Sequence, residues 1–445
     1  MPTKAELYVP ASLFSVENPL REASAKVAGY MVRNRISRVG ICLEPGWQAV
    51  EALLGCMHAG VSAGMLSMRW PGAAVNQALG QLGIKYVLTK RTDLKVECLD
   101  PAVCYVETPL TGNASSHKGV ATIVYTSGSS ATPRAVAHSL ENHITSAQSA
   151  CAALDLGSSD RWLLSLPLWH VSGISIVFRC SIAGATIVIP DPGMSLMEAL
   201  SSYQITHVSM VPTQLIRALE QAQKPPRHLR AVFVGGGPLP QGVLKTAVNR
   251  GWPIRSTYGM TETSSMVTLS QKNPPPGSSG HALQGNELKI AGDGEILVRS
   301  PSICLGYLNN DAIVSVADDD GWLHTGDLGR LDENGELYVL GRKDNMFISG
   351  GENISPEEIE FALCDVRGVQ KAVVVPVPDP EFGQRPVAFI KGSAKFKDLE
   401  RALNRELPRF KIPKYYPWPD SAGSHSLKPD RKLFTELAAR LQENS

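Results

Sequence analysis

From the amino terminus to about Arg342, short apolar runs rich in β-branched residues alternate with longer helix-like stretches. This alternation is typical of α/β layering with mostly parallel strands. Loops that bind ligands are then expected at the carboxyl ends of those strands. The apolar runs are VGICL, YVLTK, IVYTS, WLLSLPL, ATIVIPD, HVSMVPT and AVFVGGG, and one clear helical stretch extends from Trp47 to His58.

The pattern changes in the segment that follows. It is richer in glycine and in hairpin turns, which predicts a small antiparallel, barrel-like subdomain that closes the large α/β domain. The stretches that carry this pattern are GEILVRSP, GYLNN, GWLHTGDLGRL and GELYVLGRKDN.

A third pattern begins at Ser355-Pro356-Glu357-Glu358, where an N-cap serine, a proline at the first helical position and a glutamate three residues after the cap predict a helix start. Its apolar face would comprise Ile359, Ala362, Leu363 and Val366. Strands are predicted for KAVVVPVPD and RPVAFIKG, and helices for residues 397–407 and 432–441. Together they predict a compact C-terminal α+β domain of about a hundred residues.

The composition of the chain limits the classes of function that it can have. The chain has 445 residues, 43% of them hydrophobic and 19% charged, which is ordinary for a globular protein and too long for a single core. Its 43 basic and 42 acidic residues give a net charge of +1, so no long-range field favours nucleic acid or an anionic membrane. We therefore expect small-molecule chemistry; whether the chain forms a homo-oligomer stays open.

The cysteines and the amino terminus bear on location. The eight cysteines are scattered, with no CxxC pair and no histidine at zinc spacing, so we expect reduced thiols. The first twenty residues lack an apolar signal region, and no run approaches the length that crosses a bilayer. These features predict a cytoplasmic protein without membrane insertion.

The segment TSGSSATPRAV, from Thr126 to Val136, follows the apolar run Val120 to Tyr125. A strand that enters a loop of serine, threonine and glycine can surround phosphate with hydroxyl and backbone N–H donors. The loop does not end in the Gly-Lys-Ser/Thr of a Walker A loop, which excludes the usual P-loop ATPase. Taken alone, it could also be a surface turn.

Three further motifs accompany this loop: YGMTE at Tyr258 to Glu262, TGD at Thr325 to Asp327, and GRKDN at Gly341 to Asn345. With the loop, they closely resemble the superfamily of acyl-CoA synthetases, luciferases and peptide-synthetase adenylation domains, over nearly the whole chain. The loop departs from the common TSGTTGxPKGV form by having Ser130, Ala131, Arg134 and Ala135. The positive charge is kept, whereas alanine adopts positive φ less readily than glycine.

The resemblance implies that ATP and Mg²⁺ bind here and that the loop holds the β- and γ-phosphates. The implied phosphate-binding residues are Thr126, Ser127, Gly128, Ser129, Ser130, Thr132 and Arg134. Gly235 and Gly236 would form the loop on the adenine side, although a plain strand-to-helix turn explains them equally well. Tyr258 would stack on adenine, with Gly259 beside it.

The remaining implied roles concern the reacting phosphorus and the ribose. Thr261 would contact the α-phosphate, and Glu262 would coordinate Mg²⁺. Asp327 would accept both ribose hydroxyls, since a carboxylate offers two acceptor oxygens, and Arg342 would assist it. Lys428, in SHSLKPDRKLF, aligns with the catalytic lysine that bridges the acid and the α-phosphate.

The resemblance also implies a division of the chain. Residues 1–342 would form the large adenylation domain, residues 343–344 a hinge, and residues 345–445 a mobile C-terminal domain. The polar pair Lys343-Asp344 suits a hinge because exposed polar residues can change φ and ψ without disturbing a core. A plain linker would have the same sequence.

The stretch DRWLLSLPLWHVSGISIVFRC, residues 160–180, resembles the o-succinylbenzoate-CoA ligases of menaquinone and phylloquinone synthesis. Their substrate has two carboxylates, and the one that is not activated must be recognised. We hypothesise that Arg179 meets it directly or through water, because an unpaired buried carboxylate is costly. An arginine paired elsewhere in the fold is the alternative.

Three neighbours of Arg179 are candidates for the acyl pocket. His170 would lie at the pocket, unless it is a satisfied core histidine, and Ser172 and Gly173 would form its wall, with the glycine leaving room for an acyl group. The implied reaction is formation of an acyl-adenylate from ATP and the acid, followed by displacement of AMP by the thiol of coenzyme A. Another acyl- or aryl-CoA ligase, a catalytically silent nucleotide-binding relative and an adenylation enzyme serving a carrier protein stay as alternatives.

Overall fold

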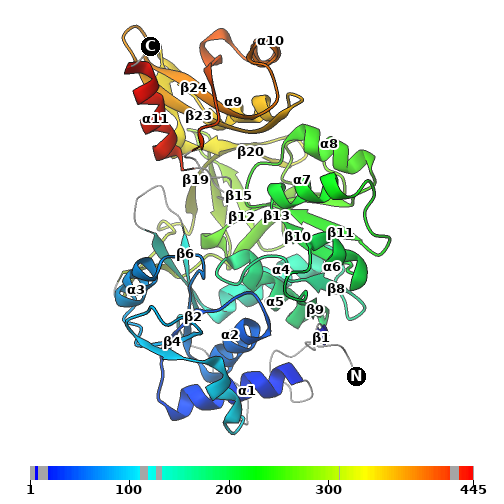
Figure 1. Ribbon diagram of the computed structural model, residues 1–445, viewed down its shortest axis with the longest axis vertical. Helices are drawn as coiled ribbons and strands as arrows, with labels where there is room; N and C mark the ends of the chain where they lie inside the picture. The colour runs from blue at the N-terminus through cyan, green and yellow to red at the C-terminus, as the bar shows by residue number, and fades with distance from the viewer. Residues whose placement is uncertain are drawn as a thin grey trace.

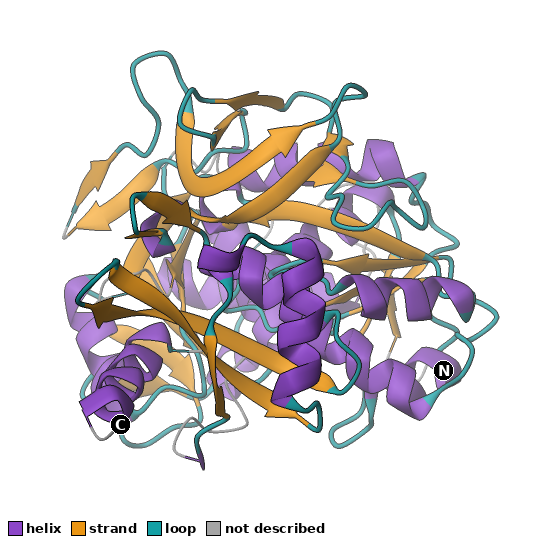
Figure 2. Ribbon diagram, turned by 90° about the horizontal axis from the view of Figure 1, so that it is seen from above, coloured by secondary structure: helices purple, strands orange, loops and turns teal. Residues whose placement is uncertain are grey.

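The computed structural model describes residues 6–8, 19–110, 119–126, 133–309, 311–420 and 430–443. Two large sheets with helices around them make up most of the molecule, and a small unit containing α9, α10 and α11 lies at the top of the view in Figure 1. Seen from above, helices flank the strands of the large sheets (Figure 2). Among the described helices, none is both long and apolar enough to cross a lipid bilayer.

The first large sheet has eight strands in the order β1-β9-β8-β10-β11-β12-β13-β14. Pairing is parallel from β9 to β12 and antiparallel at the edges. The strands are β1 Glu6–Tyr8, β8 Arg161–Leu163, β9 Thr186–Val188, β10 His207–Met210, β11 Ala231–Val234, β12 Ile254–Met260, β13 Ser265–Leu269 and β14 His281–Ala282. The predicted strand WLLSLPL is shorter than expected, because it ends before the turn that contains Pro167.

The second large sheet also has eight strands, in the order β18-β17-β7-β6-β3-β2-β4-β5, and it is parallel from β6 to β5. Its strands are β2 Arg38–Cys42, β3 Ser62–Met65, β4 Tyr86–Thr89, β5 Glu97–Leu99, β6 Thr122–Thr126, β7 Arg134–His138, β17 Gly306–Asn309 and β18 Ala312–Val314. The two sheets confirm the predicted α/β layering with parallel centres.

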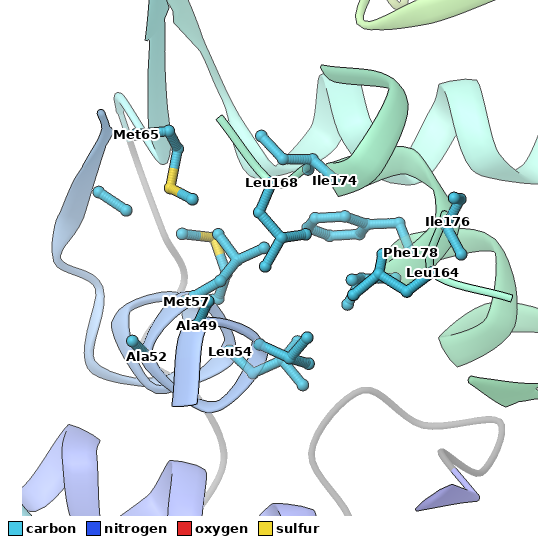
Figure 3. Packing of buried hydrophobic residues seen from close by; sticks show 14 of the residues in the cluster. Ala49, Ala52, Leu54, Met57, Met65, Leu164, Leu168, Ile174, Ile176 and Phe178 are labelled. Carbon is cyan, nitrogen blue, oxygen red and sulfur yellow. The ribbon is translucent and has the colours of Figure 1, made fainter. Parts of the chain in front are cut away.

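Helices fill the space between and around these sheets. The largest apolar cluster joins α2 and α5, and Figure 3 shows side chains of α2, such as Met57, meeting Leu168, Ile174 and Phe178 from α5 and the loop before it. The helices of the large part are α1 Pro19–Arg33, α2 Trp47–Ala59, α3 Gly72–Gln81, α4 Leu140–Leu154, α5 Val171–Ala183, α6 Leu196–Ser202, α7 Pro212–Gln221 and α8 Gln241–Asn249, with 3-10 helices η1 Pro101–Val106 and η2 Thr261–Thr263.

A separate four-stranded antiparallel sheet, β15-β16-β19-β20, confirms the predicted subdomain, which is a curled half-barrel. Its strands are β15 Glu287–Ile290, β16 Glu295–Arg299, β19 Leu323–Leu331 and β20 Leu337–Arg342. The placement of GYLNN in this subdomain is wrong. The segment forms β17, which pairs with β7 through Tyr307 and Val136 and so extends the second large sheet.

The C-terminal unit is α+β, as predicted. It contains β21 Phe347–Ser349, β22 Glu352–Ile354, β23 Val369–Asp379, β24 Gly383–Gly392, β25 Lys414–Pro417, α9 Pro356–Cys364, α10 Phe396–Glu406, α11 Arg431–Glu443, and 3-10 helices η3 Lys343–Asn345 and η4 Arg409–Lys411. Ile359, Ala362 and Leu363 are buried on the predicted face of α9. Ser355 occupies the N-cap position, but its hydroxyl donates to the carbonyl of Leu340 instead of capping the helix.

Candidate active site

The YGMTE motif lies where β12 leaves the first large sheet. A β-bulge separates Tyr258 from Gly259 in the pairing with β13. A Cβ on Gly259 would lie 2.1 Å from the carbonyl oxygen of Ser265, so only glycine lets the two strands approach this closely. The chain then turns through η2, which orients Glu262 away from the sheet ladder and toward the second sheet.

Glu262 meets residues from the second large sheet. The hydroxyl of Tyr307 donates to its Oε1 over 2.8 Å, and the guanidinium of Arg134 lies 5.1 Å from the centre of the Tyr307 ring. Burial, and then the charge of Glu262, raise the pKa of Tyr307 to about 12, so the phenol keeps its proton at neutral pH. The predicted magnesium carboxylate and the predicted phosphate-loop cation are therefore brought together by a residue that the sequence did not single out.

The predicted ribose site also assembles. Arg342 donates to Oδ1 of Asp327 over 2.9 Å, and the hydroxyl of Tyr258 donates to Oδ2 over 2.7 Å. Asp327 and Arg342 are direct partners in the ladder of β19 and β20. Burial lowers the pKa of Arg342, but Asp327 and Asp344 outweigh this effect, and the pKa is raised. Tyr258, 9% exposed, thus joins the YGMTE motif to the half-barrel.

Gly235 and Gly236 follow β11, next to the carboxyl end of β12. A Cβ on Gly235 would lie 2.4 Å from the hydroxyl oxygen of Thr257, and Gly236 has a φ of 76°. Both positions thus require glycine for close approach and for backbone conformation. They flank the strand that carries Tyr258, where an adenine-side loop is expected.

Arg179 is deeply buried, with 3% of its surface exposed. Its guanidinium donates to the hydroxyl of Ser265 over 2.8 Å and lies 5.6 Å from the ring centre of Trp162, while its Nε has no hydrogen-bond partner among the residues that the structure describes. Among the described residues, no carboxylate lies within ion-pair distance of it. Burial lowers the pKa of Arg179 to about 10, which leaves the side chain charged at neutral pH.

A buried guanidinium without an anion costs free energy and is rare in proteins. Ser265 follows η2 by two residues, so this cation sits close to the Thr261–Glu262 turn. In the part of the chain that the structure describes, no carboxylate pairs with Arg179, which speaks against the alternative that this arginine is paired elsewhere in the fold. The arrangement can receive an anionic group from a ligand.

The neighbours of Arg179 differ in how well they fit their predicted roles. His170 is exposed and occupies the N-cap position of α5, so it is not a core histidine. Ser172 is half-buried in the first turn of the same helix. The reason given for Gly173 is wrong, because its Cβ would lie 2.3 Å from the carbonyl oxygen of Pro167. The missing side chain makes room for the protein's own backbone, not for an acyl group.

Several predicted residues lie outside the described part of the chain: Ser127, Gly128, Ser129, Ser130, Thr132 and Lys428. The flanks of these segments are described. Thr126 ends β6 and pairs with Arg134 at the start of β7, so the ends of the phosphate loop are held together. Three residues beyond Lys428, Arg431 binds both oxygens of Glu360 over 2.7 Å each, which fixes the start of α11 against α9.

A magnesium ion would be held here mainly by its nucleotide. Within the described ranges, no group of three or more histidine, cysteine, aspartate or glutamate side chains is arranged to hold a metal. Mg²⁺ commonly binds through one or two carboxylates together with phosphates and water. Glu262, one of whose oxygens is oriented by Tyr307, fits this mode as a protein carboxylate.

Comparison with known proteins finds related enzymes. Residues 18–308 match the AMP-binding enzyme family, and residues 358–418 match the AMP-binding enzyme C-terminal domain. The chain is 38% identical to the 2-succinylbenzoate–CoA ligase of Listeria monocytogenes over 340 residues, which cover 75% of this chain and 70% of that protein. Alignments with other ligases of the same name, from Listeria and Bacillus, cover between 63% and 87% of those proteins.

Solved structures with the same fold carry ligands of this chemistry. The o-succinylbenzoate CoA synthetase of Bacillus subtilis in complex with its acyl-adenylate intermediate has a TM-score of 0.85 and 29% identity, covering 96% of this chain and 95% of that one. The same Bacillus subtilis enzyme in complex with ATP and a magnesium ion has a TM-score of 0.82 and 29% identity, covering 92% and 93% of the two chains.

Proposed function

This chain belongs to the AMP-binding enzyme family, and we propose that it is an acid–CoA ligase that converts o-succinylbenzoate to its CoA thioester through an acyl-adenylate. The observation that carries the choice of acid is the buried guanidinium of Arg179 near the Thr261–Glu262 turn, which has no carboxylate partner in the described part of the chain. A dicarboxylic acid can place one carboxylate at the turn and the other at this cation. An acid with a single carboxylate would leave one of the two unmet.

The residues around the turn suit the first half-reaction. Attack of a carboxylate oxygen on the α-phosphorus releases pyrophosphate and gathers negative charge on the phosphoryl oxygens. We assign Thr261 to the α-phosphate, Glu262 to Mg²⁺, and Arg134 with the phosphate loop to the β- and γ-phosphates. Bound Mg²⁺ would neutralise charge on the polyphosphate and orient it for in-line displacement.

The nucleoside would be held by residues on and beside β12. We assign the ribose hydroxyls to Asp327, with Arg342 as its support, and the adenine to the Gly235–Gly236 loop and Tyr258. The short Tyr258–Asp327 hydrogen bond supports this assignment because it ties the two binding elements into one rigid unit. Remote contacts of this kind fix the α-phosphorus relative to the acid, which lowers the entropic part of the barrier.

The second half-reaction needs the thiol of coenzyme A to attack the acyl carbon and expel AMP. We propose that residues 345–445 form a separate domain that moves about Lys343-Asp344 between the two steps and brings Lys428 to the first one. Separate apolar clusters within residues 347–438 support an independent domain. Lys343 is tethered to Asp293 over 2.6 Å and to Glu295 over 2.9 Å, so this hinge would turn about an anchored end.

A cytoplasmic location fits this chemistry. All eight cysteines are free thiols, five of them buried, as expected for a reducing compartment. A protein that keeps eight free cysteines would be exposed to disulfide exchange in an oxidising one. Fractionation that recovered the protein outside the cytoplasm would contradict this placement.

The proposed function is tested by measuring pyrophosphate release with ATP, Mg²⁺ and a panel of acids. We expect o-succinylbenzoate to give the highest kcat/KM, with benzoate-type and medium-chain acids at least about tenfold lower, the discrimination expected from one charged contact. Product mass should show the CoA thioester. A simple acid that outperforms o-succinylbenzoate would transfer the assignment to another acyl- or aryl-CoA ligase, and a requirement for a phosphopantetheinylated carrier in place of CoA would overturn the second step.

A further inference from the structure

A chain of buried polar groups lies behind the Thr261–Glu262 turn, and none of its members was singled out from the sequence. His138 and Thr122 have no exposed surface, and His143 is 2% exposed. The Nε2 atom of His138 lies 2.7 Å from the carbonyl oxygen of Thr261. The hydroxyl oxygen of Thr122 lies 3.4 Å from Nδ1 of His138 and 2.7 Å from Nε2 of His143.

The partners determine the direction of these hydrogen bonds. Because a carbonyl only accepts, Nε2 of His138 must carry a proton, and Nδ1 of a neutral ring is then an acceptor. If the hydroxyl of Thr122 donates its single proton to this Nδ1, it accepts from Nε2–H of His143. Burial lowers the pKa of His138 to about 4, which agrees with a neutral ring. All three bonds then point toward the carbonyl of Thr261, an arrangement in which each bond strengthens the next.

The chain joins elements that bind different parts of ATP. Thr122 begins β6 and His138 ends β7, and the two residues are partners in the ladder of the strands that flank the phosphate loop. Thr261 belongs to η2, one residue before Glu262. A hydrogen bond from His138 to Thr261 therefore ties the pair of strands β6 and β7 to the turn that carries Glu262.

Packing alone does not explain these groups. Apolar side chains could fill the same space without the cost of burying a polar network. His143 does stack on Phe178, with ring centres 4.9 Å apart, so its ring contributes to the core. The single polar contact that His138 makes outside the second sheet is with the Thr261 carbonyl, as far as the described residues show.

Other contacts hold the same turn from the side of β17. The carbonyl of Glu262 accepts from the backbone N–H of Cys304 over 2.8 Å, and Tyr307 binds the carboxylate. The carbonyl of Thr261 accepts from the backbone N–H of Ser264 over 3.0 Å, inside the turn, and from His138, which joins it to the second sheet. Without that donor, the carbonyl would keep only the bond from Ser264 within its own turn, and the turn would lose its hydrogen bond to β7.

We propose that His138 is a positioning residue for magnesium–ATP, holding the Thr261–Glu262 turn in register with the ends of β6 and β7. The inference rests on the proposed function, since it takes ATP as the ligand of both elements. It predicts that the loss of this one donor weakens nucleotide binding and the adenylation step, and has little effect on thioester formation from a preformed adenylate.

The experiment compares His138→Leu, which removes the donor, with His138→Gln, whose amide N–H can reach the same carbonyl. Calorimetry without acid gives the Kd for magnesium–ATP; pyrophosphate release gives the adenylation rate; and purified acyl-adenylate with CoA gives the second step. We expect the leucine variant to raise the Kd by about fivefold and to slow adenylation in proportion, as for the loss of one buried hydrogen bond. The glutamine variant should lie within about threefold of the wild type, and thioester formation should change by less than about twofold in both.

A matched control is His207→Leu, which removes another buried histidine, 2% exposed, that contacts Asp160 and lies outside the site. It should lower the thermal stability while leaving the Kd for magnesium–ATP unchanged. If His138→Leu does not fold, Thr122→Val interrupts the chain one step earlier and should raise the Kd by about threefold.

Three results would overturn the inference: a wild-type Kd in the leucine variant, equal defects in the leucine and glutamine variants, or parallel losses in both half-reactions. Failure of the proposed function is distinguishable, because the wild-type protein would then form no adenylate with any acid while the Kd comparison for magnesium–ATP could still be made.

Discussion

Replacing Arg179 by methionine should lower the activity of the protein and raise its stability. Methionine has a similar length and no charge, so it removes the guanidinium without opening a large cavity. Burial lowers the pKa of Arg179 to about 10, which corresponds to roughly 3 kcal/mol of desolvation at about 1.4 kcal/mol per tenfold change. In the absence of substrate this penalty is not offset by any carboxylate among the described residues.

Two consequences follow for the variant. The melting temperature of the free protein should rise, because replacing an uncompensated buried charge with an apolar side chain is favourable. The kcat/KM for o-succinylbenzoate should fall by about 10- to 150-fold, since a hydrogen bond to a charged group contributes about 1.5–3 kcal/mol. Arg179→Lys keeps the charge and loses the planar fork, so it should lie between the two.

The assay is pyrophosphate release at varied acid concentration, combined with thermal unfolding of each variant without ligand. An aromatic acid that lacks the second carboxylate is the control substrate, and its kcat/KM should change by less than about threefold, because it makes no charged contact with Arg179. The reasoning is refuted if the methionine variant keeps the wild-type kcat/KM for the dicarboxylic acid, if both acids lose activity equally, or if the variant melts at a lower temperature.

Three further predictions test the nucleotide site and the buried histidines. Glu262→Gln should slow adenylation by about 100-fold at low Mg²⁺, because a metal ligand and its charge are lost, and the rate should recover in part at high Mg²⁺. Pyrophosphate release across a series of magnesium concentrations measures this, and an unchanged magnesium dependence would contradict it. Asp327→Asn should raise the KM for ATP by about tenfold with little change in kcat, since one charged acceptor for the ribose is lost. Initial rates at varied ATP concentration measure this KM, and a wild-type value would remove the ribose assignment. Acid should destabilise the protein, because burial lowers the pKa of His138 to about 4, below its value in the unfolded chain. The unfolded state then takes up more protons, so the free energy of unfolding falls as the pH drops from 6.5 to 4. At pH 5.5 the loss should be about 1 kcal/mol. Thermal unfolding between pH 7.5 and pH 5 should show this loss, and it should be smaller in His138→Gln.

Local pattern was sufficient for much of the molecule. The helix at Trp47–Ala59 and the strands β23 and β24 follow from runs whose apolar spacing matches one secondary structure only. The motifs at Tyr258, Asp327 and Arg342 could be recognised because each carries its chemistry within a few residues. Their side chains do converge, through the hydrogen bonds of Asp327 with both Tyr258 and Arg342.

The contacts that complete the site lie beyond such local reasoning. GYLNN has the composition of a hairpin in the half-barrel, yet it pairs with β7 in a different sheet, and only this pairing brings Tyr307 to Glu262. The space beside Gly173 could be expected to hold substrate, but the backbone of Pro167 fills it. Which strands pair, and which segments far apart in the chain pack closely, depends on all the other segments that could pair or pack in the same place.

The sequence by itself determined the order of most elements, the chemistry of the nucleotide motifs and the presence of an arginine six residues after PLWHVSG, because these depend on neighbouring residues. The tertiary structure alone decided that Arg179 is buried without a carboxylate partner among the described residues, and that His138 and Tyr307 support the turn that carries Glu262. Burial and hydrogen-bond partnership are properties of the packed whole, since they arise from distant segments that exclude water from the same place.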